Sequence, residues 1–280
     1  MPDSRVVVIT GAGGGIGRAT AFAFAEAGGV VIAADIDEAA ARRTAELASL
    51  LGRPARAYRV DVSDAAAMEE FADAVRREHG APGVVVNNAG IGVSGSFLDT
   101  GPEDWRRVIG VNVFGVIHGC RLFAAQMVGA GRRGHIVNVA SAAAYLPSAA
   151  MPAYATTKAA VLMLTECLRA ELAGQGIGVT AVCPGVVNTD ITRTTRFAGV
   201  DAAREAEARR RLQKAYRRRG YPPEKVADQI VRAVRRDPAI LPVTPEARVG
   251  LVLSRLSPGL LRLGARLDPG AYLTRGKPSR

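Results

Sequence analysis

The stretch that decides the fold is Thr10-Gly11-Ala12-Gly13-Gly14-Gly15-Ile16-Gly17, which lies between the apolar run 5–9 (RVVVI) and the helix-like start 18–22 (RATAF). Glycines in a strand-to-helix turn let the backbone approach a pyrophosphate closely and adopt positive φ where needed. The exposed N–H groups and the dipole of the new helix then hold the anion. The stretch therefore predicts a strand–turn–helix unit that binds a nucleotide phosphate.

The alternation of strand and helix continues through the first two-thirds of the chain. Further β-branched runs lie at 30–34, 56–60, 83–86, 134–139 and 177–183, and a short one follows at 239–243. Helical patterns lie at about 16–28, 38–51, 65–79, 103–130, 154–173 and 224–236. Because the strands are continuously apolar, each is expected to be buried on both faces. We predict a doubly wound parallel α/β sheet, the Rossmann fold, in a single domain.

Composition bounds the classes of protein. The 280 residues are 48% hydrophobic and 22% charged, which is ample for a buried core. Residues 191–280 contain 21 Lys+Arg and 8 Asp+Glu, so this part of the chain accounts for its whole net charge of +11. A basic third suits an anionic surface or substrate, but an arginine-rich solvated helix gives the same composition and is the favoured interpretation. The arginines lack interleaved aromatic residues, so no nucleic-acid partner is expected.

Cysteine and histidine usage argues against metal chemistry and disulfides. The three cysteines (Cys120, Cys167, Cys183) and three histidines (His79, His118, His135) are widely spaced, without metal-ligand spacing. We expect no metal site and a reducing compartment. No targeting segment is visible at the start, and no run of 18 uncharged apolar residues is present, so the expected location is cytoplasmic.

Asp35 bears on the choice of cofactor. It ends the second predicted strand, 18 residues beyond Gly17, where a carboxylate accepts hydrogen bonds from ribose hydroxyls and repels a 2′-phosphate. The alternative role, an N-cap of the next helix, is less favoured. A second acid, Asp37, follows, and Arg18 is expected to be a solvated residue of the first helical turn. NAD is therefore predicted over NADP.

The glycine spacing, T-G-x-x-x-G-I-G, resembles the short-chain dehydrogenase/reductase family rather than the usual G-x-G-x-x-G fingerprint. Other motifs of the family follow in the order that the family has, and the resemblance covers about residues 5–243. They are Asp61-Val62, Asn87-Asn88-Ala89-Gly90, Asn112, Ser141, Tyr154-Ala155-Thr156-Thr157-Lys158, and Pro184-Gly185-Val186-Val187-Asn188-Thr189. The residues beyond 245 fall outside the resemblance.

The resemblance implies an oxidoreductase with a catalytic set of Asn112, Ser141, Tyr154 and Lys158. Ser141 would hold the substrate oxygen, Lys158 would also grip the nicotinamide ribose, and Asn112 would hold a water for proton relay. The implied cofactor-binding residues are Gly11, Gly13, Gly14, Gly15, Ile16, Gly17, Asp35, Ile36, Asp61, Val62, Asn88, Ala89, Gly90, Tyr154, Lys158, Pro184, Gly185, Val187 and Thr189.

The residues themselves support this chemistry. Tyr154 and Lys158 are four apart and share one face of a helix. A phenol of pKa about 10 is a poor base at neutral pH, and a nearby ammonium is expected to lower that pKa. Tyr154 would then exchange a proton with a carbonyl or alcohol oxygen. A tyrosine and a lysine four residues apart are usually only a surface pair. Together with the cofactor motifs, however, Tyr154 and Lys158 favour a catalytic role.

The predicted reaction is hydride transfer between NAD and a small hydrophobic secondary alcohol or ketone. The segments 142–146 and 151–152 would line an apolar pocket, and 190–222 would form a lid with apolar (Ile191, Phe197, Val200) and cationic (209–211, 217–219) parts. The alternatives are a reductase of an acyl-type or NADPH-dependent carbonyl substrate, and a dinucleotide-binding protein without turnover.

Two further expectations concern assembly. Apolar helices at about 103–130 and 154–173 are expected to pair in a homodimer or homotetramer, as the resemblance implies. Residues 1–244 are expected to form the domain and 245–280 a Leu/Arg-rich amphipathic tail. The tail is expected to pack on the domain or a partner subunit, which is favoured over contact with an anionic membrane surface.

Overall fold

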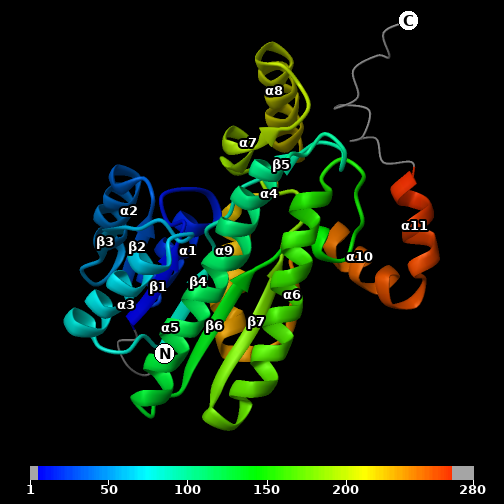
Figure 1. Cartoon of the computed structure of the whole chain (residues 1–280). Coiled ribbons are helices and arrows are strands. Elements are labelled where there is room, and N and C mark those ends of the chain that lie inside the picture. Colours follow the sequence, from blue (N-terminus) through cyan, green and yellow to red (C-terminus); the bar gives the residue numbers. More distant parts are fainter. Residues whose placement is uncertain (1–5, 267–280) are drawn as a thin grey trace, which may run out of the picture.

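The computed structural model describes residues 6–266, and its centre is a seven-stranded parallel sheet with helices on both faces (Figure 1). The strand order is β3-β2-β1-β4-β6-β7-β9, and every neighbouring pair is parallel. The strands are β1 (Val6–Thr10), β2 (Val30–Asp35), β3 (Arg56–Arg59), β4 (Val84–Asn87), β6 (Gly134–Val139), β7 (Ile177–Cys183) and β9 (Ile240–Pro242). This is the predicted doubly wound Rossmann sheet; Arg5, placed in the first strand, lies outside the described residues.

Two apolar cores sandwich the sheet, one on each face. Alternate residues of β1 show the division, since Val8 packs in the core with Phe71 and Phe123 while Ile9 packs with Phe24 on the opposite face. The first core is covered by α3 (Ala65–His79), α5 (Gly115–Gly129) and α6 (Pro152–Leu172). The second is covered by α1 (Gly15–Glu26), α2 (Glu38–Leu51) and α9 (Pro223–Arg236). Burial on both faces explains why the central strands are continuously apolar, but the expectation fails for the edge strands β3 and β9, in which no residue is buried.

The winding of the sheet reverses between β1 and β4, which pair with each other although α1, β2, α2, β3 and α3 separate them in sequence. At such a switch point the loops leaving two neighbouring strands diverge to opposite faces and open a crevice at the carboxyl edge. The glycine turn follows β1, and Asn88 follows β4. The topology therefore brings both predicted motifs to one crevice.

The predicted helix at 103–130 is interrupted. It runs as α4 (Pro102–Ile109), a π-helical turn at Gly110–Phe114, and α5. This stretch, Pro102–Gly129, is long and apolar enough to cross a membrane by length and composition, which the search for uncharged runs missed. Phe123 and Met127 of the stretch are fully buried in the core against the sheet, and 44% of its most apolar window is buried.

Residues beyond β7 build a layer over the carboxyl edge (Figure 1). Its elements are α7 (Ile191–Thr194), β8 (Arg196–Phe197) paired with β5 (Val93–Ser94), and α8 (Ala202–Arg219). Phe197, expected as an apolar contact of the lid, is instead buried in this small two-stranded sheet.

The segment after β9 forms α10 (Pro245–Leu256) and α11 (Pro258–Arg266). The small residues Ala247 and Gly250 of α10 face the domain, and a Cβ placed on Gly250 would lie 2.8 Å from a Leu146 methyl carbon. The larger apolar side chains of this predicted amphipathic segment divide: Leu251, Leu253 and Leu261 are half-buried, whereas five are exposed, namely Val249, Val252, Leu256, Leu260 and Leu263. Leu267, part of the same pattern, lies outside the described residues.

Candidate active site

The glycine turn is fixed by contacts that leave no room for a side chain at Gly11, Gly13 or Gly17. Ala12 N–H donates to Ala34 O at 3.0 Å, and Gly13 N–H donates to Asp35 Oδ2 at 2.8 Å. A Cβ placed on Gly17 would overlap Gly11 O and lie 2.6 Å from Asn88 Nδ2. The turn is thus pressed against the ends of β2 and β4, which explains the glycine at position 17.

Asp35 organises the turn rather than capping a helix. Its second oxygen, Oδ1, accepts from Asp37 N–H at 3.0 Å. The N-cap of α2 is Asp37, whose side chain accepts from Ala40 N–H. The alternative role considered for Asp35 is therefore wrong. Ile36, the next predicted cofactor residue, is 58% exposed at the same strand end.

Arg18 is not the solvated residue predicted from the sequence. Its guanidinium donates to the carbonyl oxygen of Gly13 and, through Nε, to Thr44 Oγ1 at 3.2 Å. Thr44 in turn donates to Ala12 O at 2.9 Å. Arg18 thus ties the glycine turn to α2, a contact that only the folded chain brings about.

Asn88 joins the ends of β1 and β4. Its amide donates to the carbonyl oxygens of Thr10 and Gly11, both at 3.0 Å, while its backbone N–H donates to Thr10 Oγ1 at 3.1 Å. Ala89 N–H donates to the same hydroxyl at 3.2 Å. The N-N-A-G segment therefore fixes the end of β4 against the end of β1 at the crevice.

Asn112 is fully buried in the π-helical turn. Its side-chain amide forms hydrogen bonds with both the N–H and the C=O of Ile91. Its Nδ2 donates to Ile91 O at 3.0 Å, and its Oδ1 accepts from Ile91 N–H at 2.9 Å. Nδ2 also donates to Thr157 Oγ1 on α6 at 3.1 Å. π-Helical turns recur at functional sites because they re-aim one side chain of a helix. Here the turn directs Asn112 toward α6.

Lys158 is a buried ammonium that lies beside Tyr154 and Asn112. Its Nζ donates to Val139 O at 2.8 Å and lies 5.7 Å from the centre of the Tyr154 ring. A Cβ placed on Gly90 would lie 3.3 Å from Asn112 Oδ1 and 3.5 Å from Lys158 Nζ. Burial lowers the pKa of Lys158 to about 8, so the ammonium remains charged at neutral pH.

The Tyr154 phenol lies close to Ser141 and to Tyr216 of α8. Burial, and then the neighbouring Tyr216 of α8, raise the pKa of Tyr154, while the Ser141 hydroxyl lowers it only in part. The lowering of the Tyr154 pKa that was predicted from Lys158 is not found: desolvation of the phenolate dominates, and Lys158 is not among the groups that shift this pKa. Ser141 also caps the 3₁₀ turn Ala142–Ala144 by accepting from Ala143 N–H at 3.2 Å.

The remaining predicted cofactor residues border the same edge. Asp61 Oδ1 accepts from the backbone and hydroxyl of Ser63, and Val62 is buried. Thr189 lies over the turn, since a Cβ on Gly15 would be 3.0 Å from Thr189 Cβ. Gly185 N–H donates to Thr244 Oγ1 at 3.1 Å, and Pro184 and Val187 are buried.

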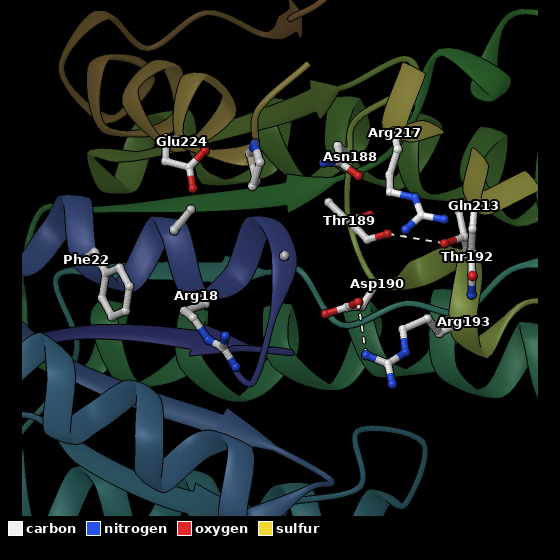
Figure 2. A pocket seen from close by; sticks show the side chains of 13 residues that line it. Arg18, Phe22, Asn188, Thr189, Asp190, Thr192, Arg193, Gln213, Arg217 and Glu224 are labelled. Carbon is white, nitrogen blue, oxygen red and sulfur yellow. Dashed lines mark hydrogen bonds and ion pairs between the residues drawn. The ribbon is translucent and has the colours of Figure 1, made fainter. Parts of the chain in front are cut away.

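A pocket of about 640 Å³ lies beside the glycine turn, between α1, α7, α8 and the start of α9 (Figure 2). Its lining is mostly polar and includes Gly15, Arg18, Thr189, Asp190, Arg193 and Arg217. Asp190 and Arg193 form an ion pair at 3.6 Å. The four predicted catalytic residues do not line it. It therefore adjoins the phosphate end of the crevice and is not the apolar substrate pocket expected from the sequence.

A doubly wound sheet with this glycine turn, and a Ser–Tyr–Lys–Asn cluster at the same edge, defines the class of nicotinamide-dependent oxidoreductases. Residues 5–198 match the family described as short chain dehydrogenase. The chain belongs to the short-chain dehydrogenase/reductase family.

The relatives agree with this assignment. The chain is 49% identical over 264 residues to the "Probable oxidoreductase EphD" of Mycobacterium tuberculosis, a match that covers 94% of this chain and 45% of that protein. It thus spans about half the length of such relatives. It is 39% identical over 190 residues to the meso-2,3-butanediol dehydrogenase of Serratia marcescens, covering 68% and 74% of the two chains.

Among solved structures, a short-chain dehydrogenase/reductase from Burkholderia phymatum in complex with NAD superposes with a TM-score of 0.84 at 34% identity. The match covers 94% of this chain and 95% of that one. The likeness therefore extends well beyond the 5–198 region matched by the family.

Proposed function

We propose that this chain catalyses reversible hydride transfer between NAD(H) and a hydrophobic secondary alcohol or ketone. The observation that carries the proposal is the gathering of Tyr154, Ser141, Lys158 and Asn112 at the carboxyl edge beside the glycine turn. Two of the relatives described above bear the names of an oxidoreductase and of a dehydrogenase of a secondary diol.

The glycine turn fits the diphosphate of a dinucleotide. Gly14, which precedes α1, has no side chain to cap the helix, and the first turn of α1 holds no acid that would repel an anion. The N–H groups of that turn thus suit a phosphate. Asp35 would take the ribose of the adenosine half, Lys158 that of the nicotinamide half, and Thr189 would lie over the diphosphate. When bound, the nicotinamide ring supplies or accepts the hydride.

The chain's own residues manage the substrate oxygen. Ser141 would donate a hydrogen bond to it and fix it beside the Tyr154 phenol. In reduction the Tyr154 O–H gives its proton to that oxygen, and in oxidation the phenolate takes one from the alcohol. The Lys158 ammonium, 5.7 Å from the centre of the Tyr154 ring, would stabilise the phenolate once it forms, and Asn112 ties the Ile91 backbone to Thr157 of α6.

Tyr154→Phe tests the proposal. Without the phenolic proton, turnover of a panel of secondary alcohols and ketones with NAD(H) should fall by about a hundredfold to ten-thousandfold. NADH binding, followed by fluorescence, should persist because the glycine turn is untouched. Tyr58→Phe, the same change at a hydroxyl bonded to Glu78 instead, is the matched control. Substantial turnover by Tyr154→Phe would reject Tyr154 as the proton carrier.

We further propose a homo-oligomer built on α5 and α6. Val128 of α5 and Met163 of α6 are 40% and 61% exposed, and Phe114, just before α5, is 50% exposed. Such large apolar side chains on neighbouring helices suit a second copy of the chain. Sedimentation of a monomer at micromolar concentration would contradict this proposal.

A further inference from the structure

The loop 184–189, which follows β7, is held by residues that lie beyond the 5–198 region matched by the family. Three of its backbone N–H groups donate to acceptors from the C-terminal part. Gly185 donates to Thr244 Oγ1 at 3.1 Å, and Val186 donates to Glu246 Oε1 at 3.1 Å. Asn188 donates to Tyr221 O at 2.9 Å. Residues beyond 198 therefore hold the loop 184–189 in position.

The carboxylate of Glu246 joins three elements. Besides accepting from Val186 of the loop, it accepts through Oε2 from Arg219 Nη2, the last residue of α8, at 2.8 Å. Glu246 itself lies in the first turn of α10, where the helix dipole favours a negative charge. Burial opposes the charge, but the hydrogen bonds from its own N–H, Arg219 and Val186 hold the pKa of Glu246 below its usual value.

The loop has little freedom on either side. A Cβ placed on Gly185 would overlap both Glu246 Oε1 and Thr244 Oγ1, so the backbone rests directly on its two acceptors. On the opposite side Pro184 O accepts from Ala142 N–H at 2.8 Å and from Ser141 Oγ at 3.4 Å. A shift of the loop would therefore reach Ser141, which lies beside Tyr154.

We propose that Glu246 is a positioning residue that holds the loop 184–189, with Thr189 over the glycine turn, in place for the cofactor. Arg219 acts through it and links the position of the loop to that of α8. The inference rests on the proposed function, because Thr189 of this loop is assigned to the cofactor diphosphate there. It adds a requirement from α10, a helix outside the matched region.

The first test compares Glu246→Ala and Glu246→Gln in the full chain. Alanine removes the acceptor of Val186 and the partner of Arg219, so the Kd for NADH, measured by fluorescence, and the KM for NAD should both rise about tenfold. Glutamine keeps an acceptor but loses the charge, so a rise of about threefold is expected. Glu207→Ala, which breaks an exposed Arg211 pair on α8, is the matched control and should change neither constant.

The second test is a double-mutant cycle with Arg219→Ala. Since Arg219→Ala and Glu246→Gln remove the same ion pair, their effects on the Kd for NADH should not add. Additive effects would overturn the coupling. A lower Tm for Glu246→Ala with unchanged Kd and KM would show a purely structural role and overturn the proposal. Failure of the wild-type chain to bind NADH would instead contradict the proposed function.

Discussion

The glycine turn and helix α8 lie at the same edge of the sheet but are held there differently. The turn is held by short contacts to Asp35 and Asn88 in which a single added methyl group would overlap the backbone. No residue of α8, which the structure describes in full, is buried, and exposed ion pairs such as Arg211 with Glu207 run along it. The conformation of the turn is therefore fixed by close packing that leaves no space for larger residues. The position of α8 depends mainly on ion pairs, most of which exchange readily with water.

Gly17→Ala should have the largest effect. The added Cβ would overlap Gly11 O, so we expect a loss of about 3 kcal/mol in the free energy of unfolding, measured by urea denaturation, together with weaker NADH binding. Gly129→Ala is the control, because among the described residues nothing lies within 4 Å of a Cβ placed there. Equal stability of the two variants would show that the turn is as adaptable as α8.

Lys158 extends the comparison to charge, because its ammonium is buried while the arginines of α8 are mostly exposed. Its pKa in the folded chain is about 8, below the ordinary 10.5, so above pH 8 the unfolded chain binds more protons. Stability from this group therefore rises with pH in that window. Relative to Lys158→Met, the unfolding free energy of the wild type should rise by about 2 kcal/mol from pH 7 to 9.5.

The unfolding free energies should be measured by urea denaturation at each pH. Taking the difference between wild type and variant removes the contributions of groups that titrate alike in both, such as Cys120, whose pKa burial raises to about 12. A difference that does not change with pH would show that Lys158 is not desolvated as its burial indicates.

Most of the sheet was predictable from the sequence, because strands buried on both faces carry continuous apolar runs and the helices between them carry period-3.6 patterns. The π-helical turn was missed. It arises where Asn112 bonds both backbone groups of Ile91, a contact between distant segments. The β5–β8 pair was missed for the same reason, since two-residue strands have no periodicity to detect.

The same distinction applies to the site: residues within local motifs were predictable, and contacts between distant segments were not. Motif spacing located Ser141, Tyr154 and Lys158, which the structure brings together. The partners of Arg18 and the role of Glu246 were not predictable, because each depends on a hydrogen bond between segments far apart in the chain. Tyr216, beside Tyr154, lies in an arginine-rich helix whose pattern gives no sign of it.

Asp35→Asn should have a smaller effect, because the amide oxygen can still accept from Gly13 N–H while the charge is lost. The charge is what repels a 2′-phosphate, so the preference for NAD over NADP, as a ratio of kcat/KM, should fall about tenfold. Asp37→Asn, at the N-cap of α2, is the control and should leave the ratio unchanged. A wild-type preference for NADPH would contradict the assignment of Asp35 to the ribose.

Removal of residues 258–280 should have the smallest effect on the fold. The cut spares α10, with Glu246 and the buried Ala247, and removes the exposed Leu260 and Leu263 of α11. Because the exposed Leu260 and Leu263 bury little against the described residues, replacing both by glutamine should change the unfolding free energy by less than about 0.5 kcal/mol. The favoured partner for the leucines is a second subunit, so size exclusion should show a weaker oligomer. Leu260→Gln with Leu263→Gln should reproduce the loss. Sedimentation of the full chain, but not the shortened one, with anionic liposomes would instead assign this stripe to a membrane surface.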